Sequence, residues 1–213
     1  MLWKQIPCRK ENYGSKRVMP VRYLVIHYTA GDGDTAEDNG RYFQNHAAGA
    51  SAHWFVDETS CLLSVPEDHV AWHCGAAVYR HPACRNGNSI GIELCSRKRD
   101  DGSYYFRDET LENAASLVRK LMKTYGIAED RVVRHYDVTG KNCPAPLVDA
   151  GQWRRFQDMI KRYQSPEELP LWAKETIGKL MDRKILQGDG EGLDLSHEMV
   201  RILVMLDRAG VFS

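Results

Sequence analysis

The stretch that decides the fold runs from residue 89 to residue 95 and reads SIGIELC. Its isoleucine and leucine side chains alternate with small or polar ones, so we expect a strand with one apolar face. Glu93 lies within this strand, on the face opposite the apolar residues. A carboxylate there is costly to bury unless it is paired or functional, which makes Glu93 a candidate catalytic residue. The solvent-exposed face of a half-buried strand explains the same pattern equally well.

Strands and helices alternate on both sides of this stretch. Apolar residues at helical spacing predict helices over residues 111–125 and 153–163. Thr35 and Asp38 form a capping-box pattern, which predicts a helix that ends near residue 45. Short apolar runs predict further strands at residues 23–26, 53–56, 61–65 and 131–134. This order favours an α/β domain in which helices flank a mixed central β-sheet.

A polar segment divides the chain. Residues 164–170 read QSPEELP, and this proline-bracketed polar composition is typical of a linker. We therefore predict a main domain over residues 1–163 and a small helical module over residues 171–213. A module of about 43 residues buries little apolar core by itself, so we expect it to pack on the main domain or on a partner.

The composition is that of an ordinary soluble globular protein. Of 213 residues, 43% are hydrophobic and 27% are charged. Because 29 basic residues balance 29 acidic ones, no global charge favours binding to nucleic acid or to an anionic membrane. No apolar run approaches the roughly 18–20 residues of a membrane span, so we expect no membrane insertion. The first residues lack the pattern of a secretory signal, and we expect synthesis in the cytoplasm without one.

Candidate metal ligands lie at the ends of two predicted strands. His27 follows the strand at 23–26 and His135 follows the strand at 131–134, where α/β sheets place their ligands. Cys143 comes eight residues after His135. Two histidines and one cysteine would leave a fourth zinc position open, as in catalytic sites. A single histidine is more often structural or solvated, so the spacing by itself is weak evidence.

Lys141 and the remaining cysteines can each be interpreted without a catalytic role. Lys141 could place a positive charge beside such a metal, or it could be a solvated loop lysine. The chain has six cysteines but no Cys-x-x-Cys pair and no secretory signal, so a disulfide framework is not expected. A free thiol or a metal ligand is the better expectation for at least one of them.

Five stretches resemble one family, in the same order along the chain. They are VIHYTA at 25–30, SAHWFV at 51–56, AWHCG at 71–75, SIGIEL at 89–94, and RH at 134–135 with KNCP at 141–144. On these residues the chain is similar to the zinc-dependent N-acetylmuramoyl-L-alanine amidases of the type-2 amidase family. That family includes many phage and prophage endolysins and is related to the peptidoglycan-recognition proteins of animals. The resemblance extends over residues 20–163 and implies the family's α/β fold.

The resemblance implies a metal site and a catalytic pair. It implies one Zn²⁺ per chain, held by His27, His135 and Cys143. It implies Glu93 and Lys141 as the catalytic pair beside the metal. Zinc-activated water would then cleave the amide between N-acetylmuramic acid and L-alanine in bacterial peptidoglycan. Such a bacteriolytic enzyme would act on the cell wall after its release from the cell.

The resemblance also implies a substrate groove. Trp72 and His73 would line it, and His53 would border it. Some relatives place a tyrosine near the metal at the strand that contains His53, but residues 51–53 read SAH here. No catalytic tyrosine is therefore expected at that strand.

The C-terminal residues resemble a second pattern more weakly. LWAKE at 171–175 and ILQGDG at 185–190 are similar to a single S-layer-homology-like helical motif. That resemblance suggests attachment to the cell wall or self-association into a homo-oligomer, and a hairpin that only packs on the main domain is an equally good interpretation. In the turn that starts at Asp189, Leu193 and Asp194 stand where an EF-hand needs a ligand and a glycine, so we predict no calcium site.

Several alternatives remain open. Cys143 could be the nucleophile of a cell-wall cysteine peptidase, which would resist chelators and be inhibited by thiol alkylation. The chain could be a non-catalytic peptidoglycan-binding module, although relatives of that kind commonly lack the zinc cysteine. It could also be mainly a wall-binding or oligomerising protein, or a recycling amidase of the cytoplasm. A disulfide between Cys74 and Cys84 is a further possibility.

Overall fold

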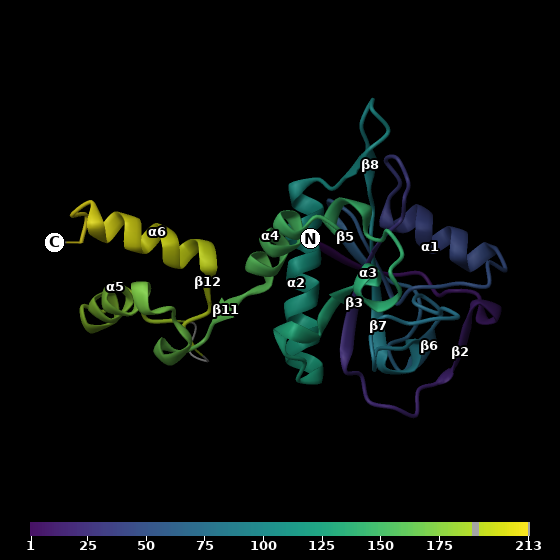
Figure 1. Cartoon of the computed structure of the whole chain (residues 1–213), viewed down its shortest axis with the longest axis horizontal. Coiled ribbons are helices and arrows are strands. Elements are labelled where there is room, and N and C mark those ends of the chain that lie inside the picture. The colour runs from purple at the N-terminus through teal and green to yellow at the C-terminus, as the bar shows by residue number, and fades with distance from the viewer. Residues whose placement is uncertain (189–191, 213) are drawn as a thin grey trace. The chain divides into compact units, whose positions relative to one another are not determined.

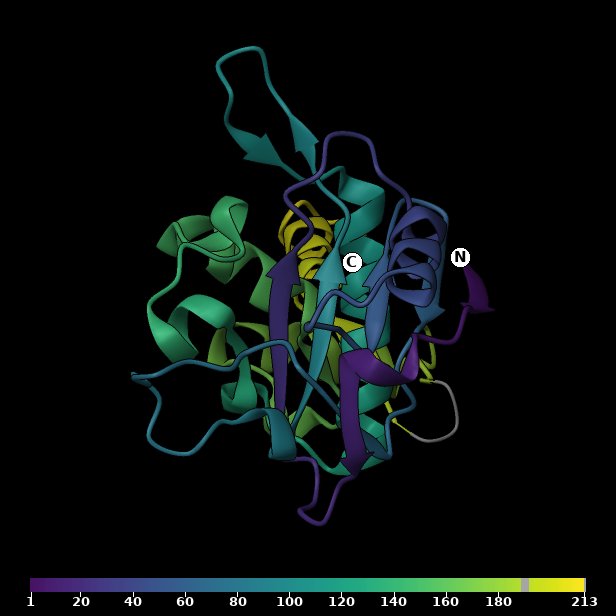
Figure 2. The same ribbon diagram turned by 90° about the vertical axis from the view of Figure 1, so that its right-hand side faces the viewer.

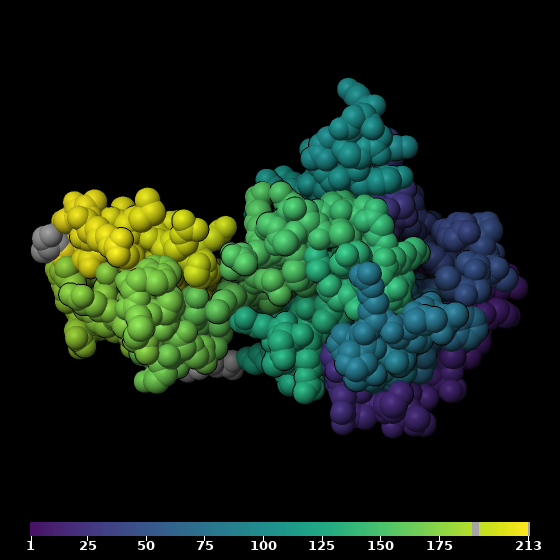
Figure 3. All heavy atoms as spheres, in the orientation of Figure 1, coloured from purple at the N-terminus to yellow at the C-terminus, as the bar shows by residue number. Residues whose placement is uncertain are grey.

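The structure is a computed structural model that describes residues 1–188 and 192–212. The chain forms two compact units, Met1–Trp153 and Arg154–Ser213, drawn as ribbons in Figure 1 and as spheres in Figure 3. Each unit contains buried hydrophobic clusters of its own. Across the described residues, no helix has both the length and the apolar character that a membrane crossing requires.

A six-stranded mixed sheet forms the centre of the first unit. Its strands lie in the order β1-β5-β4-β7-β3-β10. The β4–β5 pair is antiparallel, and the other neighbouring pairs are parallel. The bounds are β1 (Leu2–Gln5), β5 (Ser60–Leu63), β4 (Trp54–Val56), β7 (Ser89–Leu94), β3 (Tyr23–Tyr28) and β10 (Val132–Arg134). The predicted mixed sheet is confirmed, and the stretch at 89–94 is a central strand with neighbours on both sides.

Two helices cover opposite faces of this sheet, α1 (Ala36–Asn45) and α2 (Asp108–Tyr125). A Cβ on Gly40 of α1 would lie 2.9 Å from Cδ2 of Leu62 in β5. The neighbouring Cys61 instead points its thiol to the backbone carbonyl of Asn113 in α2, at 3.8 Å. Because successive side chains of a strand point to opposite faces, the two helices lie on different sides of the sheet. Figure 2 looks onto the strands with α2 behind them.

Capping interactions fix where these helices begin and end. The capping box at the start of α1 is confirmed, because Thr35 Oγ1 accepts from Asp38 N at 3.1 Å and the Asp38 carboxylate accepts from Thr35 N at 2.9 Å. The buried Asp57 carboxylate accepts from the N–H of Ala36, the first residue of α1, at 2.8 Å. Helix α2 ends at Gly126, whose φ of +62° is the left-handed conformation that glycine adopts without strain.

Smaller elements complete the first unit. Strands β2 (Tyr13–Lys16) and β6 (His69–Ala71) form one antiparallel pair, and β8 (Arg97–Lys98) and β9 (Tyr104–Tyr105) form another. Helix α3 (His135–Thr139) follows β10. Helix α4 (Ala150–Ile160) begins in the first unit and runs across the boundary at residues 153–154 into the second. Single 3-10 turns cover Lys10–Asn12, Asn86–Asn88, Glu129–Arg131, Ala145–Leu147 and, in the second unit, Pro166–Glu168.

The second unit is a pair of helices closed by a short sheet. Helices α5 (Leu171–Asp182) and α6 (His197–Arg208) accompany the antiparallel strands β11 (Arg162–Tyr163) and β12 (Leu195–Ser196). The apolar spacing predicts a helix that includes Tyr163, but α4 ends at Ile160 and Tyr163 pairs with Leu195 instead. Its side chain is buried in the cluster that includes Ile177 and Val200, so tertiary packing decides its conformation.

The compact units divide ten residues before the predicted domain limit at 163. Leu169, within the predicted linker 164–170, is buried in the core of the second unit. The functions expected for the two parts stay predictions. The turn for which we predict no calcium site includes residues 189–191, which lie outside the described residues.

Candidate active site

Parallel strands deliver two histidines to the same edge of the sheet. His27 lies in β3, and His135 comes directly after β10 as the first residue of α3. The two strands pair in parallel with Arg134 beside Ile26, so their carboxyl ends meet at one edge. The two imidazole rings lie 4.7 Å apart between centroids, and both side chains are buried.

A loop after α3 returns Cys143 to these histidines. Helix α3 ends at Gly140, and the N–H of Tyr136 at its start donates to the carbonyl of Cys143 at 2.7 Å. The peptide bond between Cys143 and Pro144 is cis. The Cys143 thiol lies 3.7 Å from Nδ1 of His27. One potential ligand atom from each of His27, His135 and Cys143 lies within 4.8 Å of the others, an arrangement that could hold a metal ion.

Glu93 faces the same cluster from the neighbouring strand. It pairs with His27 across β3 and β7, and its Oε1 lies 4.0 Å from Nδ1 of His27. Its other oxygen, Oε2, is buried and has no hydrogen-bond partner among the described residues. Burial raises the pKa of Glu93 to about 8, opposed by the positive charge of Lys141 and reinforced by the Asp34 carboxylate. A carboxyl group in this environment can both accept and release a proton near neutral pH.

The same burial controls the protonation of the three clustered side chains. It lowers the pKa of His27 well below the ordinary value, and the positive charges that His73 and His135 can carry lower it further. Burial together with Lys141 lowers the pKa of His135 to about 4. Both imidazoles are therefore neutral near pH 7, as metal ligands must be. Burial and then the Glu93 carboxylate raise the pKa of the Cys143 thiol to about 12.

A cavity of about 530 Å³ opens onto the cluster. Its walls include Trp72, His73 and Lys141 in addition to His27, Glu93, His135 and Cys143. Trp72, His73, Lys141 and His135 also line a second cavity of about 670 Å³, which continues past Gly75 and Asn86. A long substrate can thus extend to both sides of the cluster. Seven of the eight site residues predicted from the sequence line the first cavity.

His53 is the predicted site residue that does not line either cavity. Its side chain is fully buried. Its Nδ1 accepts from the N–H of Gly91 at 3.0 Å, and its Nε2 lies 3.1 Å from the carbonyl oxygen of His69 and 2.9 Å from Nη2 of Arg17. His53 therefore connects β7 to the segment around β6, and its side chain does not line either cavity.

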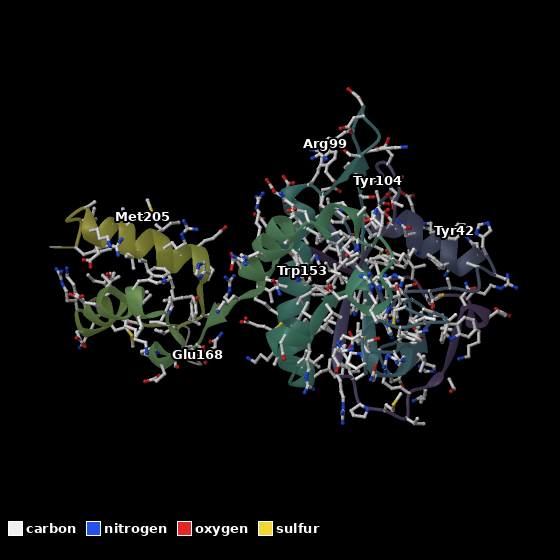
Figure 4. All side chains as sticks on the ribbon, viewed as in Figure 1. Tyr42, Arg99, Tyr104, Trp153, Glu168 and Met205 are labelled. Carbon is white, nitrogen blue, oxygen red and sulfur yellow. The ribbon has the colours of Figure 1, made fainter. Side chains whose placement is uncertain are left out.

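Sequence reasoning missed several residues of the cavity wall. They include Tyr28 and Thr29 after His27, and Asn39, Tyr42 and Phe43 on α1. Figure 4 labels Tyr42 on this helix. The spacing of three and four residues along the capped helix is a usable signal, because it places all three on one face. Nothing in the sequence shows that this face covers the ends of β3 and β7, which depends on the sheet order.

The cysteines show no bridge in the structure. All six, every one of which lies in the described part of the chain, are free and buried. Cys74 and Cys84 lie in one hydrophobic cluster with Val25 and Val138. A disulfide between Cys74 and Cys84 stays an untested possibility.

The sequence model of the N-acetylmuramoyl-L-alanine amidase family matches residues 17–146 of this chain. These residues include every side chain of the cluster described above. The matched region covers more than half of the chain and almost the whole first unit.

Curated relatives carry the same description. A probable N-acetylmuramoyl-L-alanine amidase of Bacillus licheniformis is 39% identical over 155 residues, covering 68% of this chain and 42% of the relative. The N-acetylmuramoyl-L-alanine amidase BlyA of Bacillus subtilis is 36% identical over 173 residues, covering 75% of this chain and 46% of the relative. This chain thus spans less than half the length of these relatives.

Solved structures match over a similar region. The catalytic domain of XlyA is 28% identical with a TM-score of 0.63, covering 76% of this chain and 100% of that domain. A mutant endolysin from Bacillus subtilis is 29% identical with a TM-score of 0.63, covering 76% of this chain and 99% of its own. The similarity lies in the fold that builds the cluster.

Proposed function

Because this chain belongs to the N-acetylmuramoyl-L-alanine amidase family, we propose that it is a zinc-dependent hydrolase of bacterial peptidoglycan. The bond it cleaves is the amide between N-acetylmuramic acid and L-alanine. One observation carries the proposal, the convergence of His27, His135 and Cys143 on a buried point beside Glu93. This arrangement joins a set of metal ligands to a titratable carboxyl group inside one cavity.

The donor set fits a zinc ion. Zn²⁺ takes neutral imidazoles and cysteine thiolates as ligands in proteins, so Cys143 would lose its proton on binding, and three such ligands leave a position open for substrate or water. The buried Oε2 of Glu93, with no partner among the described residues, supports a role toward water or substrate at that position. We assign one Zn²⁺ per chain to His27, His135 and Cys143. When bound, zinc would supply a Lewis acid that acidifies water and polarises the amide carbonyl.

Glu93 is the residue placed to transfer the proton. Its carboxylate takes a proton from the attacking water as the water oxygen bonds to the lactyl carbonyl carbon. The carbon–nitrogen bond then breaks, and Glu93 returns the proton to the nitrogen of L-alanine. The second proton of the water leaves the new lactyl carboxyl group for the amine, so the products are a lactyl carboxylate and a peptide with a protonated amino terminus.

Lys141 and the groove residues stabilise and orient the reacting amide. The Lys141 side chain is exposed at the mouth of both cavities, where its ammonium group can stabilise the negative charge that develops on the carbonyl oxygen. Trp72 and His73 form a shared wall of the two cavities. This wall holds the substrate on both sides of the scissile bond.

The protein acts on the cell wall as an endolysin in this proposal. The similar structure of an endolysin from Bacillus subtilis supports this role. The second unit then serves either to attach the enzyme to the wall or to bring two chains together. Its exposed Trp172 and Met205 supply surface for either task.

The test is digestion of purified cell walls, with chemical identification of the products. New L-alanine amino termini, lost after chelation and restored by added Zn²⁺, are the expected result. Cleavage that survives chelation but stops after thiol alkylation would instead assign Cys143 as a nucleophile. Binding to walls without release of any fragment would identify a recognition module.

A further inference from the structure

The two ring nitrogens of His27 face different surroundings. Nδ1 points to the cluster, 3.7 Å from the Cys143 thiol and 4.0 Å from Oε1 of Glu93. Nε2 points away from it and lies 3.0 Å from Nδ1 of His73. A neutral imidazole carries one proton, so whichever nitrogen holds it determines whether Nδ1 can offer a lone pair to a metal.

A chain of hydrogen bonds determines where that proton lies. The Ser89 hydroxyl lies 2.7 Å from the backbone carbonyl of Arg85, which can only accept, so Ser89 donates there. The same oxygen lies 3.1 Å from Nε2 of His73 and must accept from it, because its single proton is already used. Nδ1 of a neutral His73 then accepts from Nε2 of His27, which leaves the lone pair of His27 on Nδ1.

We propose that Ser89 is a positioning residue, which sets the tautomer of His73 and, through it, the metal-facing nitrogen of His27. The inference rests on the proposed zinc site, because it assigns a function to the freed lone pair. The backbone carbonyl of Arg85 sets the direction of these hydrogen bonds, because a carbonyl oxygen can accept a hydrogen bond but cannot donate one. Outer partners of this kind orient metal-binding histidines in proteins.

The strand that carries Ser89 also shapes the space for the His73 ring. Ser89, Gly91 and Glu93 alternate on one face of β7. A Cβ on Gly91 would lie 2.5 Å from Cγ of His73, closer than carbon atoms pack, so only glycine leaves room for the ring. The backbone N–H groups of His73 and Cys74 donate to Oδ1 of Asn86 at 3.2 and 2.8 Å, which anchors the loop. One face of a single strand thus holds His73 through Ser89, gives it room at Gly91 and presents Glu93.

If the hydrogen bond between His73 and His27 ran in the opposite direction, a proton would occupy the metal-facing nitrogen of His27. If His73 carried its proton on Nδ1, it would donate to Nε2 of His27, and His27 would carry its own proton on Nδ1. That N–H would point toward the Cys143 thiol and would have to be displaced before a metal could bind. Replacing Ser89 by alanine removes the fixed acceptor and permits both directions.

The first test is NMR of the imidazole nitrogens in the metal-free full chain labelled with ¹⁵N-histidine. Signals of His27 and His73 are assigned by their loss in His27→Asn and His73→Asn. The expected result is an Nε2–H tautomer for both rings, with a mixture of tautomers in Ser89→Ala. An Nδ1–H tautomer of His27 or His73 in the unsubstituted protein would overturn the proposal, and this result needs no folded variant.

The second test is zinc affinity, measured by competition with a chromophoric chelator. Ser89→Ala is expected to weaken zinc binding about 10- to 100-fold, and Ser89→Thr, which keeps the hydroxyl, is expected to restore most of it. Ser64→Ala removes another buried hydroxyl of the same unit and is expected to leave the affinity unchanged. Equal affinity of Ser89→Ala and the unsubstituted chain would contradict the inference. If the unsubstituted chain bound no zinc, the proposed function would fail, whereas the tautomers would still decide the role of Ser89.

Discussion

The two units use their side chains in opposite ways. In the first unit the candidate ligands His27, His135 and Cys143 are buried at the end of a sheet, beside the half-buried Glu93. In the second unit large apolar side chains face solvent, with Met205 on α6 67% exposed. The first unit builds its chemistry into its core, where each group is held by neighbours on several strands. The second unit offers a surface, whose residues can change without loss of the core beneath.

The largest expected effect is the loss of zinc and activity when a histidine of the first unit, but not one of the second, is replaced. His27→Ala removes one of the three proposed zinc ligands, so zinc content and wall hydrolysis should both fall below detection. His197→Ala, in the second unit, removes the hydrogen bond of 2.7 Å with the Tyr163 hydroxyl and should leave one zinc per chain. Metal analysis and release of soluble wall fragments check both variants. Full activity of His27→Ala would contradict the assignment of the metal site to the first unit.

The next effect concerns proton transfer alone. Glu93→Gln keeps the size of the side chain but cannot accept a proton, so turnover should fall about 10²- to 10⁴-fold while zinc binding persists. Glu37→Gln, which changes a surface carboxylate paired with Lys4 and Arg41, is the matched control and should be silent. Turnover of soluble muropeptides with zinc bound is the measurement. A silent Glu93→Gln would remove this residue from the mechanism.

The sequence alone identifies His27, Glu93 and His135 as candidate site residues, because each lies in or next to a strand with a clear apolar pattern. The sheet order then explains why they meet. The sequence does not predict the edge strand β1, because its four residues, three exposed and one half-buried, carry little periodic signal.

The wall contributed by α1 was not predictable for a related reason. Tyr42 lies on a helix whose start the sequence predicts well, but only the packing of Phe55 and Leu62 against that helix places it over the cluster. The expectation for His53 as a groove residue followed from a shared motif, whereas the backbone partners that bury it lie in other segments of the chain.

A smaller effect compares aspartates of the two units. Burial raises the pKa of Asp57, but the backbone N–H groups of Ala36, Thr59 and Ser60 outweigh it and hold the pKa below the ordinary value. Asp57→Ala leaves these donors without their acceptor and should lower the free energy of unfolding by about 1–3 kcal/mol at pH 7. Asp207→Ala removes a half-buried carboxylate of the second unit that accepts from the side chains of Thr176 and Lys179. It should have less effect, because the partly exposed Lys179 can turn to water.

The pH dependence of Asp57 follows from the sign of its shift. Because the folded pKa is lower than the unfolded one, its stabilisation is complete above the unfolded pKa, near 4. It is lost as the pH falls through the folded pKa. Denaturant melts should therefore show a gap between the unsubstituted chain and Asp57→Ala that narrows in acid, and a gap that widens there would contradict the assignment.

The smallest effect concerns the surface of the second unit. Met205→Ala and Trp172→Ala should weaken retention on whole cell walls by about tenfold or less, with unchanged hydrolysis of soluble fragments. Met19→Ala removes an exposed methionine from the first unit and is the matched control. Cosedimentation with walls measures retention. Sedimentation velocity of the same variants would show whether the surface pairs two chains instead.

The central claim is that His27, His135 and Cys143 together hold one zinc ion. Native mass spectrometry of the full chain, purified without chelator and supplied with Zn²⁺, measures this directly. The account predicts one zinc per unsubstituted chain and none in Cys143→Ser at the same zinc concentration. An unsubstituted chain without zinc, or a Cys143→Ser chain that retains it with equal affinity, would contradict the account.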